Sequence, residues 1–339
     1  MKTFNWAVVG PGRIAHRFAE AVNQIDNTAI RLVAGRDLAR AADFAHKWSR
    51  PGEPSARSTI SLNDVLTAAD IDCVYIATPH AFHADVIRQC LLARKPVLCE
   101  KPLVTDAVTA RELTALARSQ QTFLMEAVWT RFLPIYAEVS AWLRANEIGN
   151  VLAMQSSFCF NAPFDATSRI FDPAQAGGAL LDIGIYNLTM TRWVMAQAHG
   201  RCPEAQAIDS SAVIGPSGVD HRIAATVNFA SGVTSQFICS VESAADNTFH
   251  ILGSLGTITI HKYFSAADTA TLSVTGKEPI TVHKPLRING FEGEIEEVIA
   301  CSRTGKIESD TMPLDETIKT LEWMDQIRRD AGVRYPFDP

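Results

Sequence analysis

Lys101 is a basic residue that the sequence places at the end of a short buried strand. The apolar residues 97–99 predict that strand, and it stops at Glu100, Lys101 and Pro102. Because proline restricts the residue before it to extended backbone, we expect Lys101 to be held on a segment of restricted backbone conformation. Ligands of open α/β sheets bind at the carboxyl ends of the strands, so a lysine here is suited to hold a polar ligand. Strand position alone is equally consistent with a solvated strand end.

A second candidate site is a glycine-rich turn near the N-terminus. Residues 4–9 are expected to form a buried strand, which leads into G-P-G-R-I-A at residues 10–15 and then into a helix. Gly10 permits a tight turn, and Gly12 allows a pyrophosphate to approach the backbone at the helix N-terminus. This order of strand, glycine motif and helix predicts a dinucleotide site, the alternative being an ordinary glycine turn.

The end of the second strand, residues 30–34, carries the side chains that distinguish NAD from NADP. An acidic side chain there binds the ribose 2′-hydroxyl of NAD, whereas an arginine accommodates the 2′-phosphate of NADP. The chain has Arg36 at this position and Arg40 one helical turn later, and two guanidinium groups suit a phosphate dianion. We expect Asp37 to cap the following helix; an inward-facing Asp37 would favour NAD instead.

Composition and charge limit the classes of protein to which the chain can belong. It has 339 residues, 47% of them hydrophobic and 20% charged, which suits a globular protein with two domains. The net charge of −6 argues against nucleic acid and anionic membranes as general partners. We expect no membrane span, and no signal peptide because the glycine turn begins too early for one. The seven cysteines form no C-x-x-C pair, which favours reduced thiols in a cytoplasmic protein and no metal site.

Strands and helices alternate through residues 1–128. Besides the strands above, the pattern predicts strands at 73–77 and 122–125, helices at 37–48, 84–92 and 106–118, and a short helix capped by Ser61 or Asn63. This alternation predicts a doubly wound parallel sheet, a Rossmann domain that binds NAD(P).

From residue 129 to residue 339 the pattern changes to a period of two. Residues 223–229 and 233–241 alternate on either side of a glycine turn, which predicts an antiparallel hairpin. Other expected segments are helices at 135–143, 294–301 and 314–327 and strands at 249–252, 257–260, 272–275 and 280–282. We expect an α+β substrate domain with a large, mostly antiparallel sheet. A second subunit in a homodimer would cover one face of that sheet; a polar, solvated face is the alternative.

Four motifs spread over both domains resemble those of the Gfo/Idh/MocA oxidoreductases. They are residues 10–15, Thr78-Pro79, Glu100-Lys101-Pro102 and the G-G-A-L-L-D-I-G-I-Y of residues 177–186. Segments 98–102, 125–132 and 174–178 are most similar to one subgroup, the dimeric dihydrodiol dehydrogenases, also known as NADP-dependent D-xylose dehydrogenases. Most of the family carries a histidine in the last motif where this chain has Tyr186, a departure that fits the subgroup.

The resemblance implies hydride transfer between a carbinol carbon and the nicotinamide of NADP, with NAD possible. Lys101 is then expected to stabilise the developing alkoxide, and Tyr186 to move the hydroxyl proton. An ammonium beside a tyrosine lowers its pKa from about 10, so the two form a coherent acid–base pair. If residues 182–193 are helical, Asp182 lies one turn before Tyr186 and would bind a substrate hydroxyl or orient Lys101. The alternatives are an N-cap role for Asp182 and a half-buried core position for Tyr186.

The resemblance also assigns the surroundings of the cofactor and the substrate. His83 is expected either to contact the cofactor or to be a structural residue, and Trp129 either to face the nicotinamide or to fill the core between domains. Arg169 is expected to face the substrate, the alternative being a loop cation. The expected cofactor contacts are Gly10, Gly12, Arg13, Ile14, Arg36, Arg40, Thr78, Pro79, His80, His83, Glu100, Lys101, Trp129 and Arg131, and the expected substrate contacts are Arg169, Asp182 and Tyr186.

Three functions of different classes follow from these motifs. The first is an NADP-dependent oxidoreductase that acts on a sugar or a cyclic diol, such as a trans-dihydrodiol or a D-xylose-like substrate. The second is an NAD(P)-dependent glycosidase on the same fold, and the third is a regulator that senses NADP without turnover. A regulator has no need of Lys101 and Tyr186 together, which counts against it. The sequence does not identify the substrate.

Overall fold

The computed structural model describes residues 2–50, 52 and 54–338, and the chain divides into two compact units. The first unit runs to Trp129 and includes Arg287–Thr317; the second contains Thr130–Leu286 and the chain from Ile318 onward. The sequence assigned all of residues 129–339 to the second domain, whereas segment 287–317 belongs to the first unit. No helix in the described ranges is long and apolar enough to cross a membrane.

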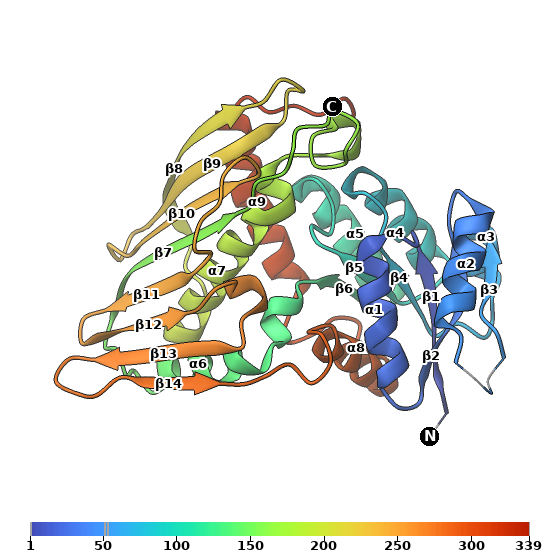
Figure 1. Ribbon diagram of the computed structural model, residues 1–339, viewed down its shortest axis with the longest axis horizontal. Helices are drawn as coiled ribbons and strands as arrows, with labels where there is room; N and C mark the ends of the chain where they lie inside the picture. The colour runs from blue at the N-terminus through green and yellow to red at the C-terminus, as the bar shows by residue number, and fades with distance from the viewer. Residues whose placement is uncertain (1, 51, 53, 339) are drawn as a thin grey trace. The chain divides into compact units, whose positions relative to one another are not determined.

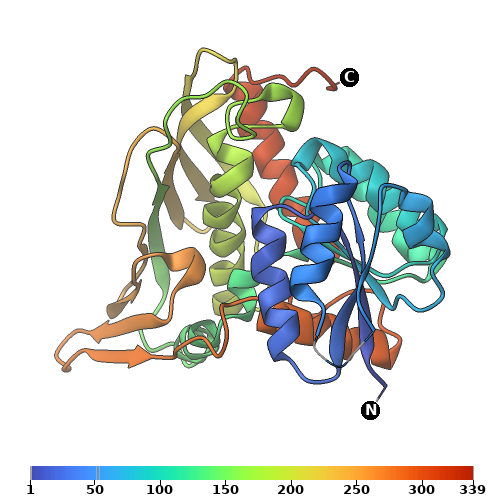
Figure 2. The same ribbon diagram turned by 45° about the vertical axis from the view of Figure 1, so that its right-hand side comes forward.

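The first unit contains a six-stranded parallel sheet, in the order β3-β2-β1-β4-β5-β6 (Figure 1). The strands are β1 Phe4–Val9, β2 Thr28–Ala34, β3 Arg57–Thr59, β4 Cys73–Ile76, β5 Val97–Glu100 and β6 Leu124–Ala127. The helices are α1 Arg13–Gln24, α2 Leu38–Trp48, α3 Leu62–Thr67, α4 His83–Leu92, α5 Ala107–Gln120 and α8 Glu292–Thr304. Helices lie on both faces of the sheet (Figure 2). The predicted doubly wound Rossmann architecture is confirmed.

Burial explains why these short runs become strands. Every residue of β4, β5 and β6 is buried, as expected for a sheet covered by helices on both faces. Phe18 of α1 stacks on Tyr75 of β4 with ring centroids 3.7 Å apart. Helices α2 and α5 begin where the sequence predicts, because the carboxylate of Asp37 caps α2 and that of Asp106 caps α5.

The second unit contains an eight-stranded sheet in the order β14-β13-β12-β11-β7-β10-β9-β8. The strands are β7 Val151–Cys159, β8 Ala205–Ile214, β9 Asp220–Phe229, β10 Thr234–Ser240, β11 Phe249–Gly253, β12 Gly256–Ile260, β13 Thr269–Val274 and β14 Ile280–His283. Only β7 and β10 pair in parallel among the described strands of this sheet. The expected mostly antiparallel sheet and the β9–β10 hairpin are confirmed, whereas β3, β7 and β8 were not predicted.

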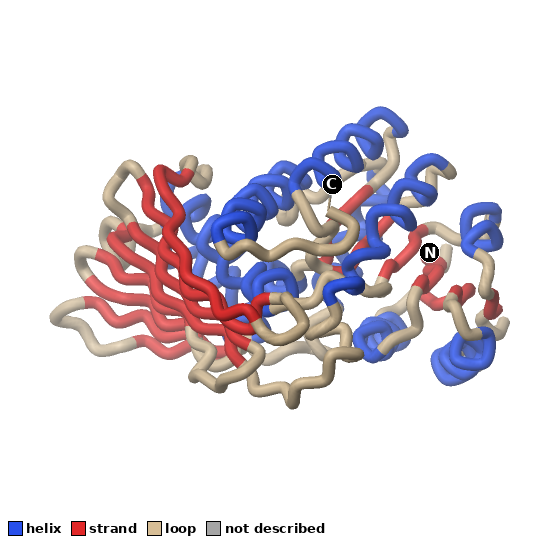
Figure 3. The backbone as a smooth tube through the Cα atoms, turned by 90° about the horizontal axis from the view of Figure 1, so that it is seen from above, coloured by secondary structure: helices blue, strands red, loops and turns tan. Residues whose placement is uncertain are grey.

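Helices of the second unit lie on one face of this sheet (Figure 3). They are α6 Pro134–Arg144 and α7 Ile185–His199, and α9 Leu314–Asp330 contributes its part from Ile318 onward. The apolar face of β9 is buried under them through Ile223, Val227 and Phe229. The opposite, outer face carries no helix in the part of this unit that the structure describes.

Candidate active site

The glycine turn between β1 and α1 has the geometry of a nucleotide-binding turn. Gly10 has φ +93°, and a Cβ there would lie 2.8 Å from the backbone of Ala77, so only glycine fits. Gly12 is the N-cap of α1, where no side chain caps the helix, and a Cβ on it would meet nothing within 4 Å. The free amides of the first helical turn therefore face open space, which suits a pyrophosphate.

At the end of β2 the acid and the arginines have separate roles. Asp37 accepts hydrogen bonds from the backbone N–H groups of Ala39 (2.9 Å) and Arg40 (3.2 Å), which confirms it as a helix cap. Arg36 and Arg40 are exposed, and neither forms an ion pair with another described residue. The Arg36 guanidinium lies 5.9 Å from the ring centre of Phe82, which is 44% exposed. The sequence reasoning missed Phe82, whose only signal is an aromatic ring two residues after Thr78-Pro79-His80.

His83, after the end of β4, is a fully buried residue with both ring nitrogens on backbone carbonyls. Its Nδ1 lies 3.0 Å from Pro102 O and its Nε2 lies 2.8 Å from Thr78 O. Burial lowers the pKa of the imidazole. These contacts join the ends of β4 and β5 and support the structural interpretation of His83. His80 lies edge-on to it with ring centroids 5.8 Å apart, and the buried hydroxyl of Thr78 has no hydrogen-bond partner among the described residues.

Two buried acids interact near the end of β5, Glu100 on that strand and Glu294 on α8. Glu100 is 9% exposed and its Oε1 accepts a 2.6 Å hydrogen bond from the hydroxyl of Tyr75. Glu294 of α8 is fully buried, and neither of its carboxyl oxygens has a partner in the described parts of the chain. Burial and the nearby charge of Glu100 raise the pKa of Glu294 well above its usual range.

The backbone after Lys101 is fixed by a residue that the sequence did not single out. Glu126 is buried at the end region of β6; its Oε1 accepts the N–H of Leu103 (2.9 Å) and its Oε2 accepts the hydroxyl of Thr317 (2.7 Å). Lys101 is partly exposed, and the Lys101–Pro102 peptide bond is cis. Glu126 thus holds in place the segment that presents the lysine.

Trp129 and Arg131 belong to different units. In the first unit, the Trp129 ring lies under the guanidinium of Arg17 (4.8 Å) and beside the ring of Phe291 (5.1 Å). In the second unit, Arg131 is buried and donates to the hydroxyl (3.1 Å) and the carbonyl oxygen (3.3 Å) of Thr189 in α7. Arg131 thereby connects the start of this unit to α7.

Asp182 and Arg169 form an ion pair in the second unit. Asp182 is 4% exposed and lies in a π-helical turn, Leu180–Gly184, that precedes α7. Arg169 donates to its Oδ1 (3.1 Å) and Oδ2 (3.4 Å), and the arginine side chain is 41% exposed. The α-helix begins at Ile185, and neither it nor the π turn has a side-chain cap, so the N-cap alternative for Asp182 is not observed.

Tyr186 lies in the first turn of α7 and is 8% exposed. Its ring is 5.5 Å from that of Phe158 on β7, at 47°. Asp182, Arg169 and Tyr186 thus belong to the second unit, and Lys101 and the nucleotide turn to the first.

Comparison with known proteins identifies the family. Residues 4–128 match the model of an oxidoreductase family with an NAD-binding Rossmann fold, Gfo/Idh/MocA, and residues 136–259 match the Gfo/Idh/MocA C-terminal domain. The chain belongs to the Gfo/Idh/MocA oxidoreductase family. It is accordingly an NAD(P)-dependent dehydrogenase with an N-terminal NAD-binding Rossmann domain.

Individual proteins match over nearly the full chain. Trans-1,2-dihydrobenzene-1,2-diol dehydrogenase of Mus musculus is 32% identical and that of Danio rerio 33% identical, each over 98% of both chains. The aldose–aldose oxidoreductase of Caulobacter crescentus, solved with glycerol, has a TM-score of 0.85 at 22% identity over 98% of both chains. KijD10, a 3-ketoreductase from Actinomadura kijaniata solved with NADP and TDP-benzene, has a TM-score of 0.83 at 23% identity over 97% of this chain and 98% of that one.

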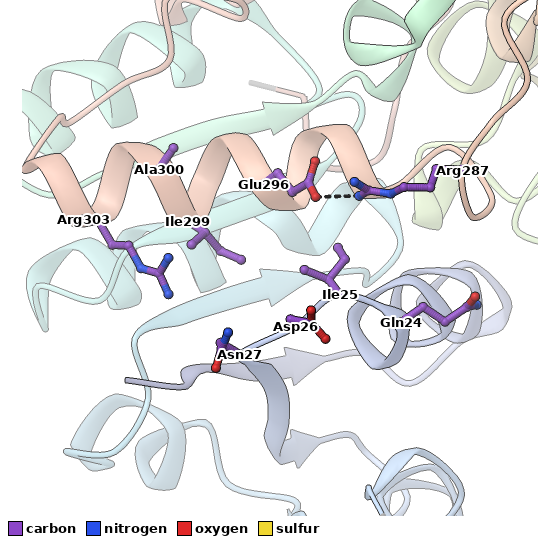
Figure 4. Close-up of a pocket in the computed structure, with 9 residues that line it drawn as sticks. All are labelled: Gln24, Ile25, Asp26, Asn27, Arg287, Glu296, Ile299, Ala300 and Arg303. Atoms are coloured by element: carbon purple, nitrogen blue, oxygen red, sulfur yellow. Dashed lines mark hydrogen bonds and ion pairs between the residues drawn. The ribbon is translucent and has the colours of Figure 1, made fainter. Parts of the chain in front are cut away.

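A cavity of about 550 Å³ on the Rossmann unit of this Gfo/Idh/MocA protein is separate from the nucleotide edge. Figure 4 shows Ile299 and Arg303 of α8 on one side and Ile25, Asp26 and Asn27 on the other. The loop that carries the last three precedes β2, so the cavity opens at the amino ends of the strands. Cofactors of such sheets bind at the carboxyl ends, and none of the expected site residues lines this cavity.

Proposed function

We propose that the protein is an NADP-dependent dehydrogenase that transfers a hydride between the nicotinamide and the carbinol carbon of a sugar or cyclic diol, trans-dihydrodiol-like or D-xylose-like. The observation that carries the proposal is the placement of Lys101 and the uncapped turn at Gly12 on one edge of a sheet. β1 and β5 are parallel members of the same sheet, so their carboxyl ends share that edge. The relatives named trans-1,2-dihydrobenzene-1,2-diol dehydrogenase support the substrate class.

The preference for NADP rests on the residues after β2. Asp37 is engaged as a helix cap, so its carboxylate does not serve the ribose of NAD. The exposed guanidinium groups of Arg36 and Arg40 are suited to bind the 2′-phosphate as charge-assisted donors. We assign the adenine to the face of Phe82 that lies against Arg36. Gly10, Gly12, Arg13 and Ile14 would surround the pyrophosphate, with Thr78, Pro79, His80 and Trp129 toward the nicotinamide side.

The nicotinamide, when bound, supplies the hydride acceptor or donor. On the protein side, the Lys101 ammonium stabilises the alkoxide that develops as the carbinol C–H bond breaks. A unit charge about 4 Å away contributes roughly 4 kcal/mol at an effective dielectric constant near 20. Tyr186 takes the hydroxyl proton in oxidation and returns it in reduction. The Arg169–Asp182 pair offers donors and acceptors for further substrate hydroxyls.

The proposal is tested by a cofactor-coupled absorbance screen over aldoses and cyclic diols with NADP and NAD. We expect steady NADPH formation with at least one of these alcohols. Lys101→Met and Tyr186→Phe should each lower kcat by about 10²–10⁴ and leave NADP affinity within a few-fold. Because the two residues act on one proton, the double variant should be little worse than either single one.

Two results would contradict this function. Hydrolysis of a glycoside without net NADPH formation would indicate a glycosidase, and tight NADP binding with no turnover would indicate a regulator. A Tyr186→Phe variant with near-normal kcat would make Tyr186 a packing residue and leave Lys101 or His83 as the base.

We also propose a cytoplasmic homodimer that forms through the outer face of the eight-stranded sheet. All seven cysteines are free thiols, and six of them are buried, which supports a reducing compartment. One row of side chains crosses the outer face in register, one from each strand. Its members are Thr281, Thr271, Thr259, His250, Gln155, Gln236, Thr226 and Asp209.

A further inference from the structure

Asp220 is a buried acid at the start of β9 that binds the turn carrying Asp182. Asp220 is 1% exposed. Its Oδ2 accepts a 2.6 Å hydrogen bond from the N–H of Leu180, the first residue of the π turn. Gly178 has φ +118°, and a Cβ there would overlap Asp220 Oδ1. The glycine is therefore required by its own backbone conformation and by the approach of the carboxylate.

The same turn is attached to the loop that carries Arg169. Gly178 donates its N–H to Ile170 O (2.8 Å), and a Cβ on Gly177 would lie 2.9 Å from Arg169 O. The hydroxyl of Tyr335 donates to Gly177 O (2.7 Å). Both members of the Arg169–Asp182 ion pair are thus attached to the Gly177-Gly178 segment.

We infer that Asp220 is a positioning residue, which fixes the register of the turn Leu180–Gly184 and through it the placement of Asp182 and Tyr186. The inference rests on the proposed function of these two residues. The amides at the start of a helix have no partners within it, and Asp220 satisfies one of them in a turn that no other side chain caps. In this register the N–H of Asp182 bonds to Gly178 O (3.3 Å). Without the carboxylate the turn can relax toward α-helical geometry, which moves Asp182 away from Arg169 and rotates α7.

The charge state of Asp220 gives the inference a measurable signature. Burial raises the pKa of its carboxyl to about 7, against the opposing effect of the amides of Leu180 and Ala179 and of Arg328. The other titratable groups that face it are Tyr335 and Cys239. A carboxylate accepts an N–H bond about twice as strongly as a neutral group. The hydrogen bond from the N–H of Leu180 to Asp220 is therefore stronger above pH 7 than below it.

The test compares Asp220→Asn, which keeps an acceptor oxygen but not the charge, with the control Asp330→Asn at the exposed end of α9 in the same unit. With the best substrate from the screen, kcat of Asp220→Asn at about pH 8 should fall about tenfold, with the affinity for NADP unchanged. The wild-type rise in kcat through about pH 7 should be lost from its profile, and the control should behave as wild type. An Asp220→Asn enzyme with wild-type kcat and an unchanged pH profile would overturn the inference.

Hydrogen exchange gives a readout that does not depend on turnover. After correction for intrinsic exchange rates, the amides of residues 180–184 in the wild type should be better protected above pH 7 than below it, and those of Asp220→Asn should not change. If no alcohol is oxidised, the proposed function fails. The exchange result would still show that the Asp220 carboxylate stabilises the turn. Equal protection of wild type and variant at both pH values contradicts the positioning role, even in an active enzyme.

Discussion

Arg36 and Asp37 are neighbours with opposite charges and different tasks. The backbone at Asp37 is extended, so its carboxylate turns back onto the first amides of α2, whereas Arg36 remains exposed beside Phe82. One carboxylate satisfies a helix terminus, and it is thereby removed from competition for the ribose. The local requirement of the helix therefore contributes to the expected preference for NADP.

Arg36→Ala is expected to weaken NADP binding by about 10- to 100-fold and to leave NAD binding within about twofold, since a charge-assisted hydrogen bond contributes about 1.5–3 kcal/mol. Arg40→Ala should act in the same direction. The matched control is Arg94→Ala, an exposed arginine that precedes β5 at the other edge of the sheet. Dissociation constants from cofactor fluorescence or calorimetry measure the ratio. An unchanged ratio in Arg36→Ala would show that the 2′-phosphate binds elsewhere.

Asp220 should also make stability depend on pH. Its folded-state pKa of about 7 lies above the ordinary value of 3.8, so the folded protein holds this proton more tightly than the unfolded chain. The corresponding stability is fully present below about pH 4 and is lost as pH rises to 7, with an upper limit near 4 kcal/mol. In urea unfolding between about pH 5 and pH 8, the free energy of unfolding of wild type relative to Asp220→Asn should therefore fall with pH. A difference that rises with pH, or stays constant, would contradict the assignment of the raised pKa to Asp220.

Residue-level reasoning from sequence succeeded where the partner is local. The cap at Asp37 and the tight turn at Gly10 follow from neighbours in the chain, and both are confirmed. The pair Arg169–Asp182 and the bond from Leu180 to Asp220 join residues 13 and 40 positions apart, and no spacing rule relates them. Such contacts appear only once the sheet has brought β9 beside the turn.

At the level of elements, the sequence predicts those whose burial is periodic. From His221 onward β9 alternates between buried and half-buried residues, and the hairpin that it forms with β10 is confirmed. β8 lies at the sheet edge with mostly exposed or half-buried residues, and β7 has consecutive serines at its centre. Neither shows the alternation of apolar residues that marks a half-buried strand. The helix expected from Asp182 begins instead at Ile185, because residues 180–184 form a π turn before it. In this turn Gly184 packs tightly on Cys239.

The two glycines of the turn between β1 and α1 have different roles: Gly10 is required by the fold, and Gly12 leaves room for the pyrophosphate. Gly10→Ala should lower the free energy of unfolding by about 1–3 kcal/mol, because it adds a Cβ at positive φ against the backbone of Ala77. Gly12→Ala has room in the folded protein, so its stability should stay within about 0.5 kcal/mol of wild type. The added methyl group occupies the pyrophosphate space, and NADP affinity should fall at least about tenfold. Urea unfolding and cofactor titration measure the two effects. A Gly12→Ala protein with wild-type affinity would place the pyrophosphate away from this turn.

At the scale of the whole chain, the Rossmann unit is completed by a segment far away in the sequence. The N–H of Leu124 at β6 bonds to Ile307 O (3.1 Å), and Arg118 pairs with Glu308 (3.1 Å) and with Asp315 (2.9 Å). A helical pattern shows that residues 294–301 have an apolar face, but it does not show which core receives that face. For this reason the sequence placed the end of the chain wholly in the second domain.

The outer sheet face is suited to a second copy of the chain because the row of side chains that crosses it is polar, with Asp209 as its one carboxylate. Its side chains hydrogen-bond laterally to one another, as Thr271 does to Thr281 (2.8 Å) and His250 to Thr259 (3.2 Å). Gln155 and Gln236 lie side by side near the middle of the row, with Nε2 of the first 3.5 Å from Oε1 of the second. A polar surface with few charges can be desolvated at lower cost than a highly charged one.

We expect the wild type to be a dimer at micromolar concentration and the double variant Gln155→Glu/Gln236→Glu to be a monomer. The two new carboxylates lie next to each other on every copy, so association would bring four like charges into a surface that excludes water, which costs several kcal/mol. Gln24→Glu, on the exposed end of α1, makes the same chemical change away from the sheet and should leave the dimer intact. Light scattering coupled to gel filtration gives the mass in each case. A monomeric wild type would remove the dimer without touching the chemistry, and a dimeric double variant would move the interface to another surface.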